Sequence, residues 1–153
     1  PSGMNAQPLR YILSNEAEGN AKIFETLAWA GSLPDWPGPS EGERPAAYIV
    51  VLNDTRIKSL AVVDSGLAMQ TILLGAVERG LGGCMFGSIK KNTLAEELQL
   101  SDHYEILWVI ALGVPVETVV LEPVGSDGST KYHRDAAGVH YVPKRSLSDV
   151  ILE

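Results

Sequence analysis

Apolar residues along the chain are least interrupted between Val62 and Ser88, where no charged residue occurs from Asp64 to Glu78. Three leucines recur there at helical spacing: Leu67, Leu74 and Leu81. The pattern predicts a helix with Asp64 as its N-cap, since that side chain can accept a hydrogen bond from the first turn. Because the helix is apolar on nearly every side, we expect it to be buried in a core or against a partner subunit. It is shorter than the roughly 20 apolar residues of a typical membrane span.

Glycines follow this predicted helix at Gly80, Gly82 and Gly83. Glycine permits a left-handed C-cap and a close approach of the backbone to a neighbour, so we expect a loop over Cys84–Ser88. Such a loop could support a bound cofactor. A core helix with an ordinary glycine stop is the simpler interpretation of this stretch alone.

Shorter patterns on either side predict alternating strands and helices. The predicted strands are Leu9–Leu13, Ala46–Leu52, Tyr104–Val114 and Glu117–Leu121, the predicted helices are Asn20–Ala30 and Thr93–Leu100, and Lys131–Tyr141 is predicted as a hairpin. Four prolines between Ser32 and Pro45 exclude a helix or a central strand there. The closing segment Lys144–Ile151 is expected to be a short helix or extended tail. Together these elements predict an α+β sheet flanked by helices, in a single domain over residues 1–153.

Composition narrows the class of partner. A formal net charge of −7 argues against binding to a nucleic-acid backbone over a broad surface. The single cysteine, Cys84, cannot form an intramolecular disulfide and suits a reducing compartment, so we expect a cytoplasmic protein. No signal peptide or lipidation motif is visible, and we expect no association with a membrane.

The sequence gives little support for a metal site or for a catalytic nucleophile. His103, His133 and His140 lie at no usual ligand spacing, and the cysteine has no cysteine partner. With Gly83, Met85 and Phe86 as neighbours, Cys84 is expected to be a buried, inert thiol. A cysteine-dependent transferase using Cys84 stays open as an alternative.

Three groups of residues fit a flavin better. The carboxamides of Asn5 and Gln7 offer donors and acceptors that match the edge of an isoalloxazine ring. The Cys84–Ser88 backbone could offer an N–H to the flavin N5, and Lys144 and Arg145 could bind a phosphate. Each group also has an ordinary interpretation as a solvated loop, a helix cap or a surface charge.

Several segments resemble the nitroreductase family of flavin oxidoreductases. PSGMNAQPLRYI is similar to that family's Pro-Ser-x-x-Asn-x-Gln-Pro-Trp-x-Phe segment, and Asp64–Gly82 is similar to its central helix and loop. The run Ile110–Pro115 resembles the following strand, and KRSLSDVI resembles the closing element. The resemblance covers essentially the whole chain in the right order.

The resemblance implies an intertwined homodimer with a long central interface helix and FMN bound at the subunit interface. It further implies an NAD(P)H-dependent enzyme of the cytoplasm that passes electrons through FMN to nitroaromatic, quinone or similar acceptors. The implied flavin contacts are Ser2, Met4, Asn5, Gln7, the backbone of Met85, Phe86, Gly87 and Ser88, and, at the phosphate, Lys144 and Arg145. No side chain is expected to act as a catalytic acid or base. A non-catalytic dimer that binds flavin weakly is the alternative.

Two departures from the family pattern matter. Leu9 stands where the family has tryptophan, which would reshape the pocket. Members of the family begin with a helix that carries an Arg-Arg-Ser-x-Arg motif, and this sequence starts after it. We therefore expect either weaker retention of FMN or phosphate binding that relies on Lys144 and Arg145.

Overall fold

The structure is a computed structural model that describes residues 1–152, and it has an α+β fold. Its contacts divide the chain into two compact units. Unit 1 comprises Pro1–Ala28 and Pro39–Pro115, and unit 2 comprises Trp29–Gly38 and the chain from Val116 onward. The single domain over residues 1–153 stays a prediction.

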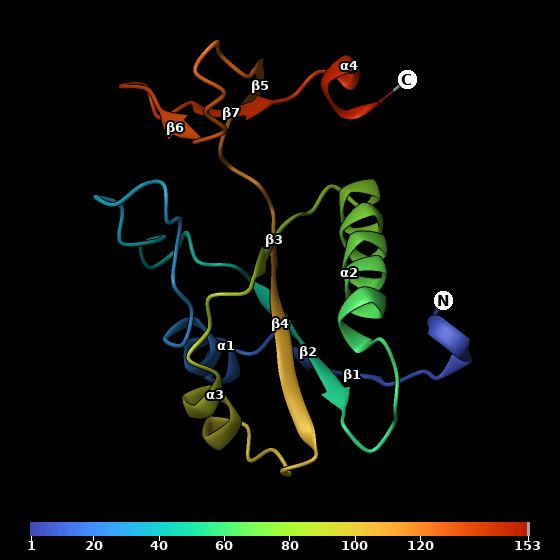
Figure 1. Ribbon diagram of the computed structural model, residues 1–153. Helices are drawn as coiled ribbons and strands as arrows, with labels where there is room; N and C mark the ends of the chain where they lie inside the picture. The colour runs from blue at the N-terminus through green and yellow to red at the C-terminus, as the bar shows by residue number, and fades with distance from the viewer. Residues whose placement is uncertain (153) are drawn as a thin grey trace. The chain divides into compact units, whose positions relative to one another are not determined.

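Unit 1 is built on a four-stranded antiparallel sheet, seen in the lower part of Figure 1. Its strands are β1 (Leu9–Ser14), β2 (Ala47–Asp54), β3 (Gly82–Phe86) and β4 (Tyr104–Gly113), in the order β1-β2-β4-β3. All three strand pairs are antiparallel. The order makes β2 and β4 central and places β1 and β3 at opposite edges.

The two central strands form the core because their apolar residues continue without a polar break. Val50, Val51, Val109 and Ile110 are all 0% exposed. This confirms the prediction that Tyr104–Val114 is a strand covered on both faces. Val51 and Ile110 pack with Met69 of the long helix at the centre of the sheet.

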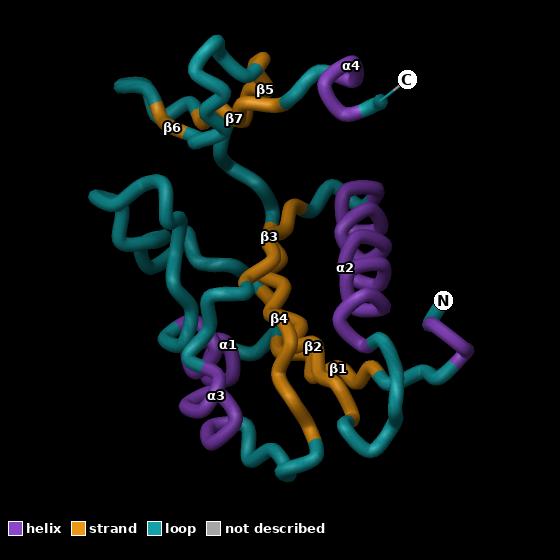
Figure 2. Tube along the Cα trace, in the orientation of Figure 1, coloured by secondary structure: helices purple, strands orange, loops and turns teal. Residues whose placement is uncertain are grey.

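The helices of unit 1 lie against this sheet, as Figure 2 shows in purple. They are α1 (Ala17–Phe24), α2 (Ala61–Glu78) and α3 (Lys91–Glu97), with a short 3-10 turn, η1, at Gly3–Asn5. Helix α1 ends before the predicted Ala30, because the chain then turns so that the Ala28 N–H donates to the Ser88 carbonyl at 3.0 Å. Helix α3 begins two residues earlier than predicted.

Helix α2 coincides with the apolar helix that the sequence predicts, but Asp64 is not its N-cap. The helix begins at Ala61, and Asp64 is buried in its first turn. There Asp64 Oδ1 accepts a hydrogen bond from the Gly3 N–H at 2.8 Å. The carboxylate therefore fastens the N-terminal loop to α2. At the other end, Gly80 adopts a φ of +73°, as the predicted glycine stop requires.

One face of α2 packs on the sheet through Ser65, Met69 and Ala76. The opposite face carries exposed apolar side chains: Val62, Val63, Leu67, Leu74 and Val77. By length and composition alone, this helix of 18 residues with a hydropathy of 1.3 could cross a membrane, so the prediction that it is too short was wrong on that count. Its buried face, which includes Asp64, fits an element of a globular sheet-and-helix unit.

The predicted loop over Cys84–Ser88 is instead largely strand β3, which includes Gly82 and Gly83. A Cβ at Gly83 would clash with Leu73 and would lie 2.8 Å from Leu112 Cδ2. The glycine therefore lets an edge strand pack tightly against the helix and against β4. Its role is close packing within a strand, and it does not form a turn.

Unit 2 holds a separate three-stranded sheet in the order β5-β7-β6. Its elements are β5 (Val119–Pro123), β6 (His133–Arg134), β7 (His140–Lys144) and the short α4 (Leu147–Val150). Strand β5 pairs with β7, so the prediction that residues 117–121 extend the first sheet was wrong. The predicted hairpin is confirmed, with β6 antiparallel to β7 and Gly138 at a φ of +81° in the turn.

Candidate functional site

A groove of about 840 Å³ in unit 1 is the strongest candidate for a functional site. It lies where the N-terminal loop, β1 and α2 meet. Residues that line it include Ser2, Asn5, Gln7, Tyr11, Ala68 and Ile72. The fold thus brings three of the residues predicted to contact a flavin to one wall of a groove, opposite small and apolar side chains of α2.

The loop that forms this wall has an unusual backbone. Met4, Asn5 and Gln7 each have a φ of +54°, in the left-handed region that residues other than glycine rarely adopt. The loop is closed by its own hydrogen bonds, since the Asn5 N–H donates to the Ser2 carbonyl at 3.0 Å and the Gln7 N–H donates to Ser2 Oγ at 2.9 Å. Strained backbone of this kind persists only where the surroundings hold it, and it is concentrated at binding sites.

The two predicted carboxamides contact each other. Gln7 Nε2 donates to Asn5 Oδ1 at 3.1 Å and to the Asn5 carbonyl at 3.2 Å. Within the described residues, Asn5 Nδ2 and Gln7 Oε1 have no protein partner. The pair therefore presents one donor and one acceptor to a ligand. Met4 lies beside them with its side chain 82% exposed.

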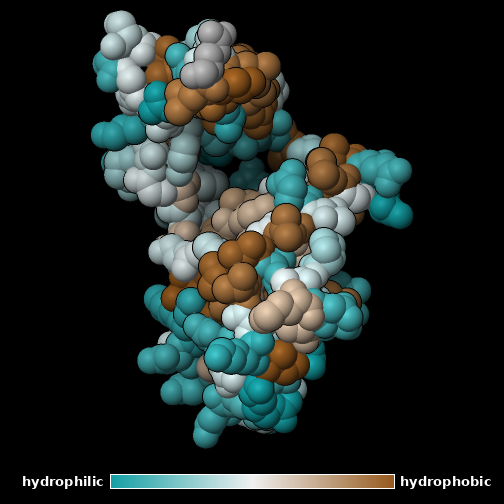
Figure 3. Space-filling view, turned by 45° about the vertical axis from the view of Figure 1, so that its right-hand side comes forward, coloured by the Kyte–Doolittle hydropathy of each residue, from teal (hydrophilic) through white to brown (hydrophobic). Residues whose placement is uncertain are grey.

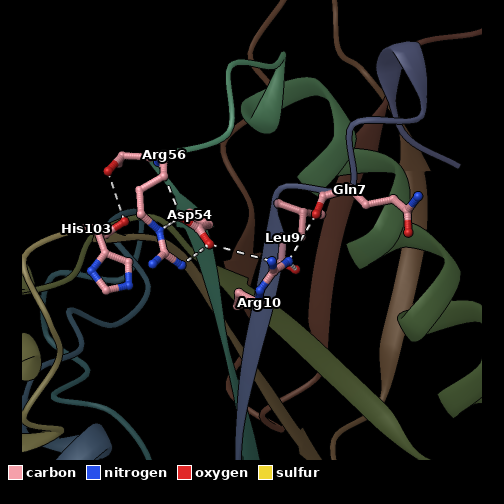
Figure 4. Close-up of polar contacts among 7 residues, drawn as sticks. Gln7, Leu9, Arg10, Asp54, Arg56 and His103 are labelled. Carbon is pink, nitrogen blue, oxygen red and sulfur yellow. Dashed lines mark hydrogen bonds and ion pairs between the residues drawn. The ribbon is translucent and has the colours of Figure 1, made fainter.

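The far end of the loop is held by a group of charged side chains (Figure 4). Asp54, 1% exposed at the end of β2, accepts two hydrogen bonds from Arg56, at 2.8 Å and 2.7 Å, and lies 3.5 Å from Arg10. Hydrogen bonding from the Arg56 side chain lowers the pKa of Asp54 to about 2. The carboxylate is therefore ionised at neutral pH. Asn53 and Asp54 both belong to strand β2, two residues beyond the predicted end of that strand.

The predicted backbone contacts on the other side of the flavin lie at the opposite edge of the sheet. Met85 and Phe86 belong to β3, where Met85 is 37% exposed and Phe86 is buried. Gly87 follows, and a Cβ there would lie 2.7 Å from the Trp108 ring. Ser88 accepts the Ala28 hydrogen bond through its carbonyl. Since β1 and β3 are the two edges of one sheet, a single chain does not bring this segment to the groove.

Lys144 and Arg145 are both exposed and belong to unit 2. The Lys144 carbonyl accepts a hydrogen bond from the Val124 N–H at 3.0 Å. Their approach to a phosphate stays a prediction.

Cys84 differs from its prediction, because its side chain is exposed on the edge strand. Within residues 1–152, no group of three histidine, cysteine or carboxylate side chains is placed to bind a metal.

Sequence reasoning missed Arg10 and Asp54, which hold the loop, and it gave Asp64 the role of an N-cap instead of a contact with Gly3. Asp54 carried one available signal, since it is a charged residue that comes two positions after the apolar run ending at Leu52. A carboxylate in that place is either solvated after the strand or buried and paired, and the sequence pattern does not distinguish the two.

Known proteins that resemble this chain in sequence or structure identify its family. A model of the nitroreductase family matches residues 1–114 of the 153 residues. A Parabacteroides distasonis protein described as an NADH dehydrogenase/NAD(P)H nitroreductase is 28% identical, with a TM-score of 0.61 over 77% of this chain and 68% of that one.

Two further solved structures share the fold. An FMN-dependent nitroreductase of Clostridium difficile is 20% identical, with a TM-score of 0.61 over 76% of this chain and 69% of that one. A Desulfovibrio desulfuricans protein solved in complex with FMN is 23% identical, with a TM-score of 0.67 over 100% of this chain and 76% of that one. The match over 114 residues covers well over half of the sequence, and the chain therefore belongs to the nitroreductase family.

Proposed function

We propose that this chain is an FMN-dependent oxidoreductase that passes electrons from NAD(P)H to a nitroaromatic, quinone or similar electron-poor acceptor. The observation that carries the proposal is the groove whose wall presents Asn5 Nδ2 and Gln7 Oε1, in a chain of the nitroreductase family. When bound, FMN supplies the electron-transfer chemistry, and the protein supplies position and electrostatics.

The residues of the groove fit a flavin. Its volume of about 840 Å³ lies within the range of small-molecule sites. A donor and an acceptor side by side match the alternating polar edge of an isoalloxazine ring, and the apolar Ile72 and Tyr11 suit the ring faces. Ser2, Met4, Asn5 and Gln7 would hold the ring edge. FMN-containing relatives with the same fold support this assignment.

The remaining flavin contacts are proposed to come from a second copy of the chain. Within one chain the β3 segment lies at the edge of the sheet away from the groove, so residues 85–88 could reach a flavin only from a partner. We propose a homodimer formed through the apolar face of α2, where Leu67, Leu74 and Val77 are 51%, 61% and 66% exposed. Figure 3 shows apolar, brown atoms exposed on the side of unit 1 that carries this helix. Such a patch marks an interaction surface.

Lys144 and Arg145 are proposed to bind the FMN phosphate through charge-assisted hydrogen bonds.

A cytoplasmic location is proposed from the single cysteine. A cysteine-dependent transferase using Cys84 is the alternative, and Cys84→Ser leaving turnover intact would remove it.

The test is a visible absorption spectrum of the purified protein with and without added FMN, measured together with its mass in solution. A dimer with a resolved flavin band, which then oxidises NAD(P)H in the presence of a nitroarene or quinone, is the expected result. A flavin-binding dimer without turnover would instead establish a non-catalytic flavin protein. A monomer whose addition leaves the FMN spectrum unchanged would contradict the proposal.

Asn5→Ala is expected to weaken FMN binding by about 1–3 kcal/mol, because it leaves a polar group of the flavin unpaired in the groove. Fluorescence titration of FMN measures this. Asn92→Ala, on the exposed surface of α3, is the matched control and should leave the affinity unchanged. Equal affinities of the two variants would remove Asn5 from the flavin site.

A further inference from the structure

The side chain of Arg10 folds back along its own strand onto the loop that precedes it. Its Nη1 donates to the Gln7 carbonyl at 3.0 Å and to the Leu9 carbonyl at 2.9 Å. In Figure 4 the Gln7 carbonyl faces Arg10 while the Gln7 side chain points away from it. Arg10 therefore contacts the backbone of a residue whose side chain lines the groove, without being one of the proposed flavin contacts.

Asp54 holds this arginine and the loop together. Its carboxylate lies 3.5 Å from Arg10 Nη2, and its backbone N–H donates to the Pro8 carbonyl at 2.9 Å. Two successive carbonyls, those of Gln7 and Pro8, are thus fixed by one buried residue, the first through Arg10 and the second directly. A carboxylate that is 1% exposed cannot move to follow a displaced loop without losing its partners.

Fixing the Gln7 carbonyl matters because of the backbone of Gln7. Its φ of +54° lies in the left-handed region, which is unfavourable for a residue other than glycine. Left free, this residue would relax to a negative φ, and its side chain would turn out of the groove, which would break the contact between Gln7 Nε2 and Asn5 Oδ1.

We propose that Arg10, held by Asp54, is a positioning residue that fixes the left-handed loop and thereby aims the Asn5 and Gln7 carboxamides at the flavin. The proposal rests on the proposed function. Arg10 itself also lines the groove. Hydrogen exchange in the flavin-free protein therefore separates positioning of the loop from direct contact with a ligand.

Arg56 provides a matched control within the same group of charges. It binds the same carboxylate with two hydrogen bonds and lies over the Tyr104 ring, 5.9 Å from its centroid. Among the described residues, its side chain forms no hydrogen bond or ion pair with residues 1–9. A general loss of charge pairing at Asp54 would therefore affect the Arg56 and Arg10 variants alike, whereas loss of loop positioning would affect only the Arg10 variants.

The experiment compares Arg10→Gln, Arg10→Lys and Arg56→Gln with the wild-type chain in two measurements. The first is hydrogen exchange of the Asn5, Ala6 and Gln7 amides in the flavin-free protein, since these amides donate within the loop. The second is the Kd for FMN. Arg10→Gln should speed exchange of these amides and raise the Kd about tenfold, the loss expected of one charge-assisted hydrogen bond. Arg56→Gln should leave both within about twofold.

Arg10→Lys should restore part of the affinity, because lysine keeps a positive charge but has one nitrogen, whereas arginine uses Nη1 for the carbonyls and Nη2 for Asp54. It also replaces Arg10→Gln if that variant does not fold. Unchanged exchange in both Arg10 variants would overturn the proposal, as would faster exchange with an unchanged Kd, or equal losses in Arg56→Gln. If the wild-type chain binds no FMN, the proposed function fails, and the exchange of the loop amides still decides whether Arg10 positions the loop.

Discussion

Both units contain an open β-sheet, but they are held together by different interactions. In unit 1, apolar side chains from Pro8 to Ala111 are buried. In the described part of unit 2, no apolar side chain reaches that degree of burial, and Leu121 and Val116 are 67% and 87% exposed. Unit 2 thus contains apolar residues, but several of its large apolar side chains are exposed to solvent.

Polar and aromatic contacts take the place of a core in unit 2. Glu117 accepts a hydrogen bond from Arg134 at 2.6 Å and lies 3.1 Å from His140 Nδ1. The Arg134 guanidinium lies over the Trp36 ring at 4.6 Å, and the His133 ring stacks on Tyr141 at 5.2 Å. Contacts of this kind are individually weak when they are partly exposed. The comparison teaches that burial of apolar side chains can stabilise unit 1 by itself. Unit 2 depends instead on charge pairing or on a surface that covers its apolar residues.

The largest effect should come from Ile110→Ala in unit 1. Ile110 is 0% exposed beside Val51 and Met69, so the truncation should lower the free energy of unfolding by about 2–5 kcal/mol. Leu121→Ala in unit 2 should change it by no more than about 0.5 kcal/mol. Urea denaturation measures both. A large effect of Leu121→Ala would break the comparison and would show that unit 2 is covered in the assembled protein.

A second contrast uses one glycine from each unit. Gly83→Ala should destabilise unit 1 by about 1–3 kcal/mol, because the added Cβ meets Leu73 and Leu112 in a packed region. Gly31→Ala in unit 2 adds a Cβ that meets nothing within 4 Å and should be close to neutral. Thermal unfolding of the two variants sharpens the comparison. Equal melting temperatures would show that β3 can move away from α2 at little cost.

Acid should act on unit 1 through Asp54. Its pKa is lowered to about 2 by hydrogen bonding from Arg56, against roughly 3.9 in an unfolded chain. A lowered pKa adds stability above the unfolded value, and that stability is lost as the pH falls through the folded value. The stability difference between the wild type and Asp54→Asn should thus be constant above about pH 5 and should shrink between about pH 4 and 2. Urea unfolding across this range measures it, and a difference independent of pH would contradict the role of the carboxylate.

The smallest effect is expected for Glu117→Gln in unit 2. Partial burial raises the pKa of Glu117, but hydrogen bonds from His140 and Arg134 outweigh it, so that the pKa lies below its usual value. Because the Glu117 side chain is 39% exposed, solvent screens these pairs, and their loss should cost less than about 1 kcal/mol. Hydrogen exchange should accelerate within residues 116–144 only. Acceleration that extends into the first sheet would mean that the two units unfold together.

The sequence predicted the central strands well because their apolar runs are long. Residues 104–114 contain one charge, and burial of such a run on both faces follows from its composition. Prediction failed where a residue's role depends on distant partners. Asp64 is a residue type that often caps helices, yet it accepts a hydrogen bond from Gly3, 61 positions away. Gly83 does not form a turn, and its missing side chain allows close packing against Leu73.

The candidate site shows the same division. The residue types at Asn5 and Gln7 indicated a flavin edge, because carboxamides carry the needed donors and acceptors wherever they stand. Their shared groove with α2 could not be inferred from spacing, since Ala68 and Ile72 come to it across the fold. The resemblance to a family added the expectation that the two belong to one site.

The sequence by itself therefore determined local properties. It showed which stretches are apolar enough to form the central sheet and α2, and which residue types can bind a flavin. These properties belong to each segment, and neighbouring residues decide them. The tertiary structure alone decided that Arg10 and Asp54 hold the loop, that residues 116–152 form a separate sheet, and that one face of α2 is left uncovered. Each of these depends on pairing between residues far apart in the chain, and the energy of such a pair exists only once the fold has brought its partners within contact distance.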